Sequence, residues 1–142
     1  MAITFYAENI DFPKIKKRET ANWIKNVVKN YGKQAGDISY LFCTDEKILE
    51  INRQYLQHDF YTDIITFDYS EGERMSGDIF ISIDTVLSNS IQYHTDFEEE
   101  LYRVIIHGVL HLCGLNDKSD SESKQMKEAE ERALKLRKES GN

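Results

Sequence analysis

The chain has 142 residues, of which 40% are hydrophobic, and this is enough for one domain around its own core. The formal net charge of −7 argues against a uniformly basic nucleic-acid binder, because Lys and Arg make most phosphate contacts. Two cysteines do not form a disulfide framework, and we find neither a secretory signal nor an apolar stretch long enough to span a membrane, so we expect a cytoplasmic protein.

The periodicity of apolar residues predicts strands and helices in mixed order. Strands are expected at residues 3–6, 37–43, 63–69 and 78–82, which are rich in apolar, β-branched and aromatic side chains. Helices are expected from Pro13 to Gly32, from Asp45 to Tyr55, from Asp84 or Thr85 to Tyr93, from Asp96 to Cys113, and from Ser119 or Asp120 onward. The polar stretch 70–77 is expected to be a hairpin connection or a surface loop. This order predicts the α+β class, with a small mixed sheet of about four strands packed by about five helices.

Positive charge is concentrated between residues 14 and 33, which we call the basic segment. It contains seven basic residues and one acid, so it carries +6 and the rest of the chain carries −13. Two interpretations stay open. The favoured one is the solvated face of a helix, and the other is a surface that contacts nucleic acid.

A cluster of possible metal ligands lies near the end of the fourth predicted helix. His107 and His111 are four residues apart, so both imidazoles lie on one helix face, one turn apart. Gly114 ends the helix, and the turn that follows can bring the Asp117 carboxylate to the same ion. Two histidines, one carboxylate and an open fourth position are typical of catalytic zinc, with hydrolysis through metal-bound water.

The residue after the first histidine restricts the chemistry. Zinc proteases with the pattern H-E-x-x-H carry their general base there, but this chain has Gly108. The helix is therefore zincin-like without the zincin base, and peptidase activity loses support. Cys113 points away from the histidine face. Two histidines and a carboxylate also suit non-haem Fe(II), so the types of the ligands alone do not exclude iron as the bound metal.

Three blocks of sequence resemble the YbeY family of rRNA maturation factors. Residues 107–117 are similar to that family's pattern H-G-x-L-H-L-x-G-x-x-H, and residues 77–82 (GDIFIS) to its strand G-D-I-x-I-S. Upstream, Asn52, Tyr55, Asp59, Thr62, Asp63 and Phe67 match a third block. Three departures stand out: Asp117 replaces the third His, Leu56 replaces an Arg, for which Arg53 or His58 could substitute, and Tyr61 replaces a Pro.

The resemblance implies one metal-dependent hydrolase domain over residues 1–142, a cytoplasmic zinc-dependent endoribonuclease that cuts single-stranded RNA in 16S rRNA maturation. It implies one zinc per chain, with His107 and His111 matching the family's first two metal ligands, and RNA and the ribosome as partners. Asp117 stands where the family has its third ligand, and a carboxylate is an acceptable zinc ligand. Possible RNA contacts in the basic segment are Lys14, Lys16, Lys17, Arg18, Lys25 and Lys29. Thr62 and Asp63 either shape a turn, which we favour, or support the metal site. The alternatives are a non-catalytic zinc-containing ribosome-assembly factor and, less favoured, a metallopeptidase.

Overall fold

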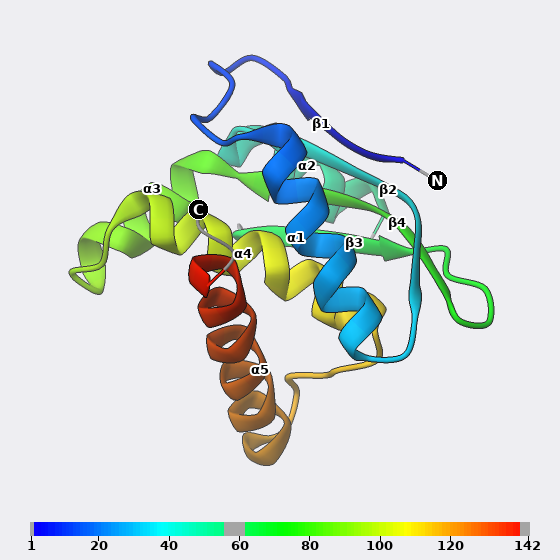
Figure 1. The fold of residues 1–142 in the computed structure, drawn as a ribbon. Coiled ribbons are helices and arrows are strands. Elements are labelled where there is room, and N and C mark those ends of the chain that lie inside the picture. Colours follow the sequence, from blue (N-terminus) through cyan, green and yellow to red (C-terminus); the bar gives the residue numbers. More distant parts are fainter. Residues whose placement is uncertain (1, 56–61, 140–142) are drawn as a thin grey trace.

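The computed structural model describes residues 2–55 and 62–139, and within these ranges it contains four strands and five helices (Figure 1). In chain order they are β1 (Ile3–Ala7), α1 (Lys17–Asn30), β2 (Gln34–Cys43), α2 (Asp45–Tyr55), β3 (Ile64–Asp68), β4 (Arg74–Ser82), α3 (Ile83–Gln92), α4 (Phe97–Leu112) and α5 (Asp120–Glu139). The order of elements that the sequence predicted is confirmed. None of these helices has both the length and the apolar character that crossing a membrane requires.

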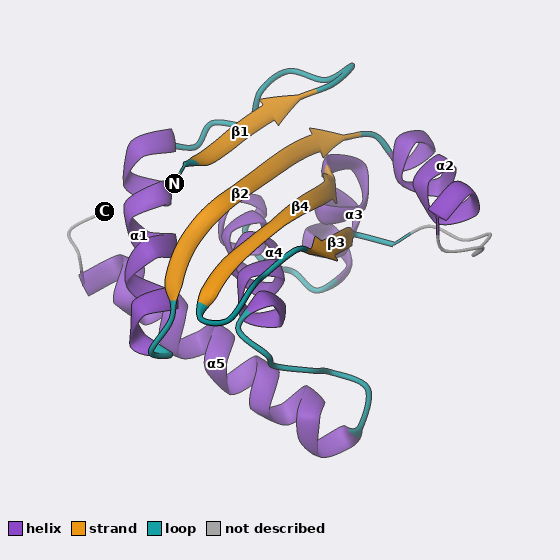
Figure 2. Ribbon diagram, turned by 90° about the vertical axis from the view of Figure 1, so that its right-hand side faces the viewer, coloured by secondary structure: helices purple, strands orange, loops and turns teal. Residues whose placement is uncertain are grey.

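The four strands form one mixed sheet in the order β1-β2-β4-β3 (Figure 2). The first three strands in that order run parallel, whereas β3 is an edge strand that pairs antiparallel with β4. The register places Thr66 opposite Ile79 and Asp68 opposite Gly77. Because cross-strand partners share a face, Thr66 and Asp68 point to the same side of the sheet as Ile79. The edge strand thus presents polar side chains on the face that α4 covers.

The main core lies between that face of the sheet and the helices α1 and α4. Tyr40 of β2 is fully buried there, and its hydroxyl donates a hydrogen bond of 2.9 Å to the Ile105 carbonyl of α4. Helix α5 packs outside these two helices and is fixed by the Trp23 indole, which donates to the Ala133 carbonyl at 2.8 Å. These bonds join the sheet, α1, α4 and α5 into one body, so residues of α5 can reach those of α4.

Helix α4 has well-defined ends, and these ends determine where its histidines lie. The Asp96 carboxylate caps its start by accepting the Glu99 amide at 3.3 Å, and three acids in the first turn favour the positive end of the helix dipole. At the other end Gly114 has φ +102°, a conformation that L side chains rarely adopt. The chain therefore reverses just after His111, as the sequence predicted.

Three element boundaries differ from the sequence-based expectation by three or four residues. Strand β2 begins at Gln34 and β4 at Arg74, so part of the stretch expected to be a loop is strand. Met75 is buried on the helix-covered face, while Arg74 lies on the other side, which tolerates polar residues. Helix α1 begins at Lys17 rather than Pro13, because the preceding segment packs Phe12 and other apolar side chains on the core without helical structure.

Candidate metal centre

Two histidines and an aspartate converge at the C-terminal end of α4. The rings of His107 and His111 lie one helical turn apart, with 4.6 Å between their centroids. After the turn at Gly114, the Oδ2 atom of Asp117 lies 3.4 Å from His107 Nε2 and 3.6 Å from His111 Nε2. The structure thus brings together the three residues that the sequence singled out as ligands.

The donor atoms have the spacing that a bound transition metal needs. One ligand atom from each of the three residues lies within 4.8 Å of the other two. With metal–ligand bonds of about 2.1 Å, tetrahedral coordination separates ligand atoms by about 3.4 Å, close to the two histidine-to-aspartate distances. The side chain of His111 is 30% exposed and that of Asp117 is 42% exposed, so one side of the group faces solvent. Such an open position is typical of catalytic rather than structural metal sites.

A cleft of about 490 Å³ opens beside these ligands. One wall is the end of α4 with the turn that carries Asp117, and the other is the entry to β3 and its cleft-facing side chains, among them Thr62, Asp63 and Thr66. This volume is within the range of about 300–1,000 Å³ that small-ligand sites usually have. The three candidate ligands are therefore accessible from a hollow of the size that small-ligand sites usually have.

Thr62 and Asp63 have different surroundings within this cleft. The Thr62 hydroxyl donates to the Ile64 carbonyl at 3.3 Å and accepts from the Asn52 amide at 3.4 Å, contacts that shape the turn into β3. Burial raises the pKa of the Asp63 carboxyl, and the nearby His107 imidazole opposes that rise. Asp63 is thus the one of the two that interacts electrostatically with the first histidine.

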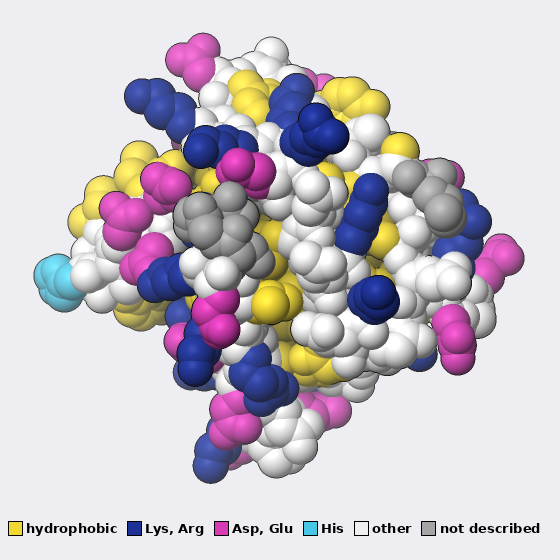
Figure 3. Space-filling model, in the orientation of Figure 1, with side chains coloured by type: hydrophobic (Ala, Val, Ile, Leu, Met, Phe, Trp, Pro, Cys, Tyr) yellow, Lys and Arg dark blue, Asp and Glu magenta, His cyan; other side chains and the backbone are white. Residues whose placement is uncertain are grey.

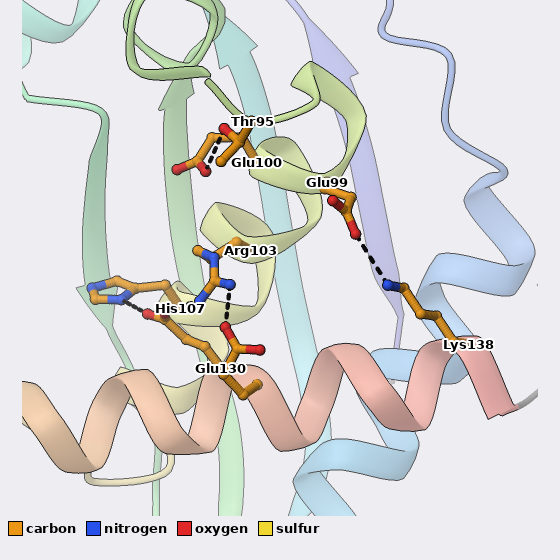
Figure 4. A network of polar contacts seen from close by, with 8 residues as sticks. Thr95, Glu99, Glu100, Arg103, His107, Glu130 and Lys138 are labelled. Carbon is orange, nitrogen blue, oxygen red and sulfur yellow. Dashed lines mark hydrogen bonds and ion pairs between the residues drawn. The ribbon is translucent and has the colours of Figure 1, made fainter. Parts of the chain in front are cut away.

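Glu130 of α5 contacts the metal group and was missed by sequence reasoning. Its Oε2 lies 2.6 Å from His107 Nδ1, and its Oε1 accepts from Arg103 at 3.0 Å (Figure 4). Arg103 also contacts the neighbouring Glu131. Burial lowers the pKa of His107, but the hydrogen bond and charge of Glu130, assisted by Asp117, outweigh this and raise it. The first histidine therefore has a carboxylate at each of its ring nitrogens.

One signal in the sequence could have identified Glu130. It lies in the apolar stripe of the last helix, one residue after Ala129, four after Met126 and three before Ala133, all of which are buried. A carboxylate on a buried stripe requires a partner. The helix is so rich in exposed charges that this position does not stand out among them.

The basic segment lies elsewhere on the molecule. Its six residues considered for RNA contact are all exposed, and none lines the cleft. Lys14 and Lys16 instead line a smaller pocket with Glu98 and Tyr102, near the start of α4 and away from its histidine end. On the face that α1 occupies, Lys and Arg side chains are separated from one another by other side chains and do not merge into one patch (Figure 3).

Gly108 lies where α4 packs tightly against the sheet. A Cβ atom there would lie 3.0 Å from Ile64 Cδ1 and 3.1 Å from Ile79 Cδ1. The position after the first histidine thus faces the core. The absence of a side chain at Gly108 lets the isoleucines of the sheet pack closely against the helix. Of the residues compared with the YbeY pattern, Leu56, His58, Asp59 and Tyr61 lie outside the described residues.

Comparisons with known proteins cover nearly the whole chain, and those with named relatives point to one family. A family model described as Endoribonuclease YbeY matches residues 5–138. A protein named endoribonuclease YbeY from Parabacteroides distasonis is 63% identical over 136 residues, 96% of each chain. Its namesake from Bacteroides thetaiotaomicron is 61% identical over 137 residues, 96% of this chain and all of the other. A solution structure of a Thermotoga maritima protein matches with a TM-score of 0.66 at 27% identity, covering 96% of this chain and 89% of that one. The chain belongs to the Endoribonuclease YbeY family.

Proposed function

We propose that this chain is a zinc-dependent endoribonuclease that cleaves single-stranded RNA. Its substrate is the 16S rRNA precursor, processed at its 3′ end during ribosome assembly and quality control, and its place of action is the cytoplasm. The observation that carries the proposal is the group of three metal ligands in the wall of an open cleft, in a chain of this family. The domain that carries the activity comprises the whole chain, residues 1–142.

The residues of the site have separable roles in this proposal. His107, His111 and Asp117 hold the ion, which when bound supplies a Lewis acid and activates water for hydrolysis at neutral pH. Thr62 shapes the cleft through its turn contacts, and Asp63 acts on His107 through its charge. The helical spacing of the two histidines and the family resemblance favour zinc over iron. A zinc peptidase of the H-E-x-x-H type needs a glutamate as general base at position 108, where this chain has glycine.

Metal dependence gives the first test. Protein stripped with a chelator should lose cleavage of a single-stranded RNA that contains the 3′ end of the 16S rRNA precursor, and stoichiometric zinc should restore it. The same RNA annealed to its complement serves as the control substrate and should stay intact. Cleavage that survives complete metal removal, as verified by elemental analysis, would show that the activity does not depend on this site.

The basic segment provides a second prediction. Lys25 and Lys29 are exposed and lie one turn apart on α1. If this face contacts RNA, Lys25→Glu and Lys29→Glu should each weaken RNA binding roughly tenfold at low salt and reduce its salt dependence. Lys138→Glu on α5 makes the same charge change as a control. Equal affinities for all three variants would support the alternative, a solvated helix face.

One observation favours the second candidate, a non-catalytic zinc-containing ribosome-assembly factor. The described residues that line the cleft include Asp63, Asp68 and Asp117 but no Lys or Arg, so none of them neutralises a phosphate. His107→Ala separates the two candidates. Loss of rRNA processing with fold and ribosome binding both intact supports the nuclease, whereas normal processing by the zinc-free variant supports the assembly factor.

A further inference from the structure

Glu130 is a buried carboxylate whose two oxygens have different partners. Its side chain is 7% exposed, and a charge with so little contact with water must be paired. One oxygen faces His107 Nδ1 at 2.6 Å, and the other faces the Arg103 guanidinium at 3.0 Å. Arg103 places a positive charge beside the carboxylate, and the oxygen near His107 is within hydrogen-bond distance of the ring.

This contact determines which nitrogen of His107 carries the proton. An ionised carboxylate can only accept, so Nδ1 must donate its hydrogen to Glu130. In the neutral ring Nε2 is then left with its lone pair, and Nε2 is the atom that lies 3.4 Å from Asp117 Oδ2. The hydrogen bond thus fixes both the tautomer and the ring orientation that metal binding needs.

The other histidine has no comparable support. Across residues 2–55 and 62–139, the only polar contact of the His111 ring is that between Nε2 and Asp117. His111 is also the more exposed of the two, at 30% against 20% for His107. The two ligands therefore differ, since one is held in place before the ion arrives and the other is free to adjust to it.

We infer that Glu130, with Arg103 behind it, is the positioning residue of the metal centre, and that helix α5 is thereby part of that centre. This rests on the proposed metal site. The matched comparison is Glu131, the next residue, which also contacts Arg103 but is 66% exposed and does not touch His107. Glu131 thus shares the contact with Arg103 that joins α4 to α5 but lacks the contact with the first histidine.

Zinc affinity, measured by competition with a chromophoric chelator, tests the inference. Glu130→Ala should weaken zinc binding roughly 10- to 100-fold, whereas Glu131→Ala should leave it unchanged. Glu130→Gln keeps an acceptor for the Nδ1 hydrogen and should lose less than the alanine variant. Circular dichroism should confirm that each variant is folded, and Glu130→Gln replaces Glu130→Ala if the latter is not.

A second measurement uses the zinc-free protein. At a pH high enough for the His107 ring to be neutral, nitrogen-15 NMR of the wild type should show His107 protonated at Nδ1 and unprotonated at Nε2, and Glu130→Ala should lose this pattern while the His111 signals stay as they are. Equal zinc affinity in the two alanine variants, or a neutral His107 ring that carries its proton on Nε2 in the wild type, would overturn the inference. Absence of zinc binding in the wild type would instead contradict the proposed metal site, and the NMR result would still decide the role of Glu130.

Discussion

Asp117→Ala is expected to remove zinc and to lower RNA cleavage by at least about 10³-fold, because activation of water at neutral pH is lost with the ion. Asp117→His is expected to keep both properties. The YbeY pattern that residues 107–117 resemble has histidine at this position, and a histidine nitrogen is as suitable a zinc ligand as a carboxylate oxygen. Metal content and single-turnover cleavage should be measured on the same preparations of both variants.

The structure also indicates that the fold will survive these changes. The Asp117 side chain is 42% exposed and lies in the turn between α4 and α5, where its contacts are with the two histidines. Thermal unfolding of the zinc-free variants should therefore match that of the zinc-free wild type. Wild-type zinc content and cleavage in Asp117→Ala would show that the carboxylate is not a ligand, whereas His111→Ala should reproduce the loss.

Gly108→Glu, which recreates the zinc-protease pattern in the sequence, is expected to destabilise the protein rather than convert it into a peptidase. The new Cβ would lie within 3.0 Å of Ile64 and 3.1 Å of Ile79, and the carboxylate would enter the core between α4 and the sheet. Overpacking costs about 1–3 kcal/mol and an unpaired buried charge costs more, so the free energy of unfolding should fall by at least about 3 kcal/mol. Urea denaturation measures this directly.

Gly108→Ala is the matched control for size without charge. Its methyl group meets the same two isoleucines, but alanine favours the helix by about 1 kcal/mol over glycine, so the net cost should be at most about 2 kcal/mol. A stable Gly108→Glu protein, or one that cleaves an unstructured polypeptide when zinc is present, would contradict the packing that the structure assigns to this position.

The sequence predicted the ligand group because all three residues are local to one helix and the turn that follows it. The four-residue spacing of His107 and His111 determines their angle on α4, and Gly114 indicates where the chain reverses. Asp117 then lies within reach without any knowledge of the rest of the fold. The alternation of apolar residues also predicted the order of elements, since each strand has a buried face.

Features that depend on distant parts of the chain were not predictable in this way. Glu130 reaches His107 only because α5 packs against α4, and the short apolar stripe that contains this glutamate does not stand out in a helix rich in charged residues. Arg74 and Ser76 of β4 are polar because they lie on the sheet face that α2 covers only in part. The position of the basic segment relative to the cleft likewise follows from the docking of α1.

Anomalous X-ray scattering at the zinc edge, from crystals of the zinc-reconstituted protein, tests the central claim most directly. A single strong peak should lie within about 2.0–2.2 Å of His107 Nε2, His111 Nε2 and an Asp117 carboxylate oxygen, with a fourth position open to the cleft. No peak at this position in protein that carries stoichiometric zinc, or a peak held by other residues, would contradict the claim that these three side chains form the metal centre.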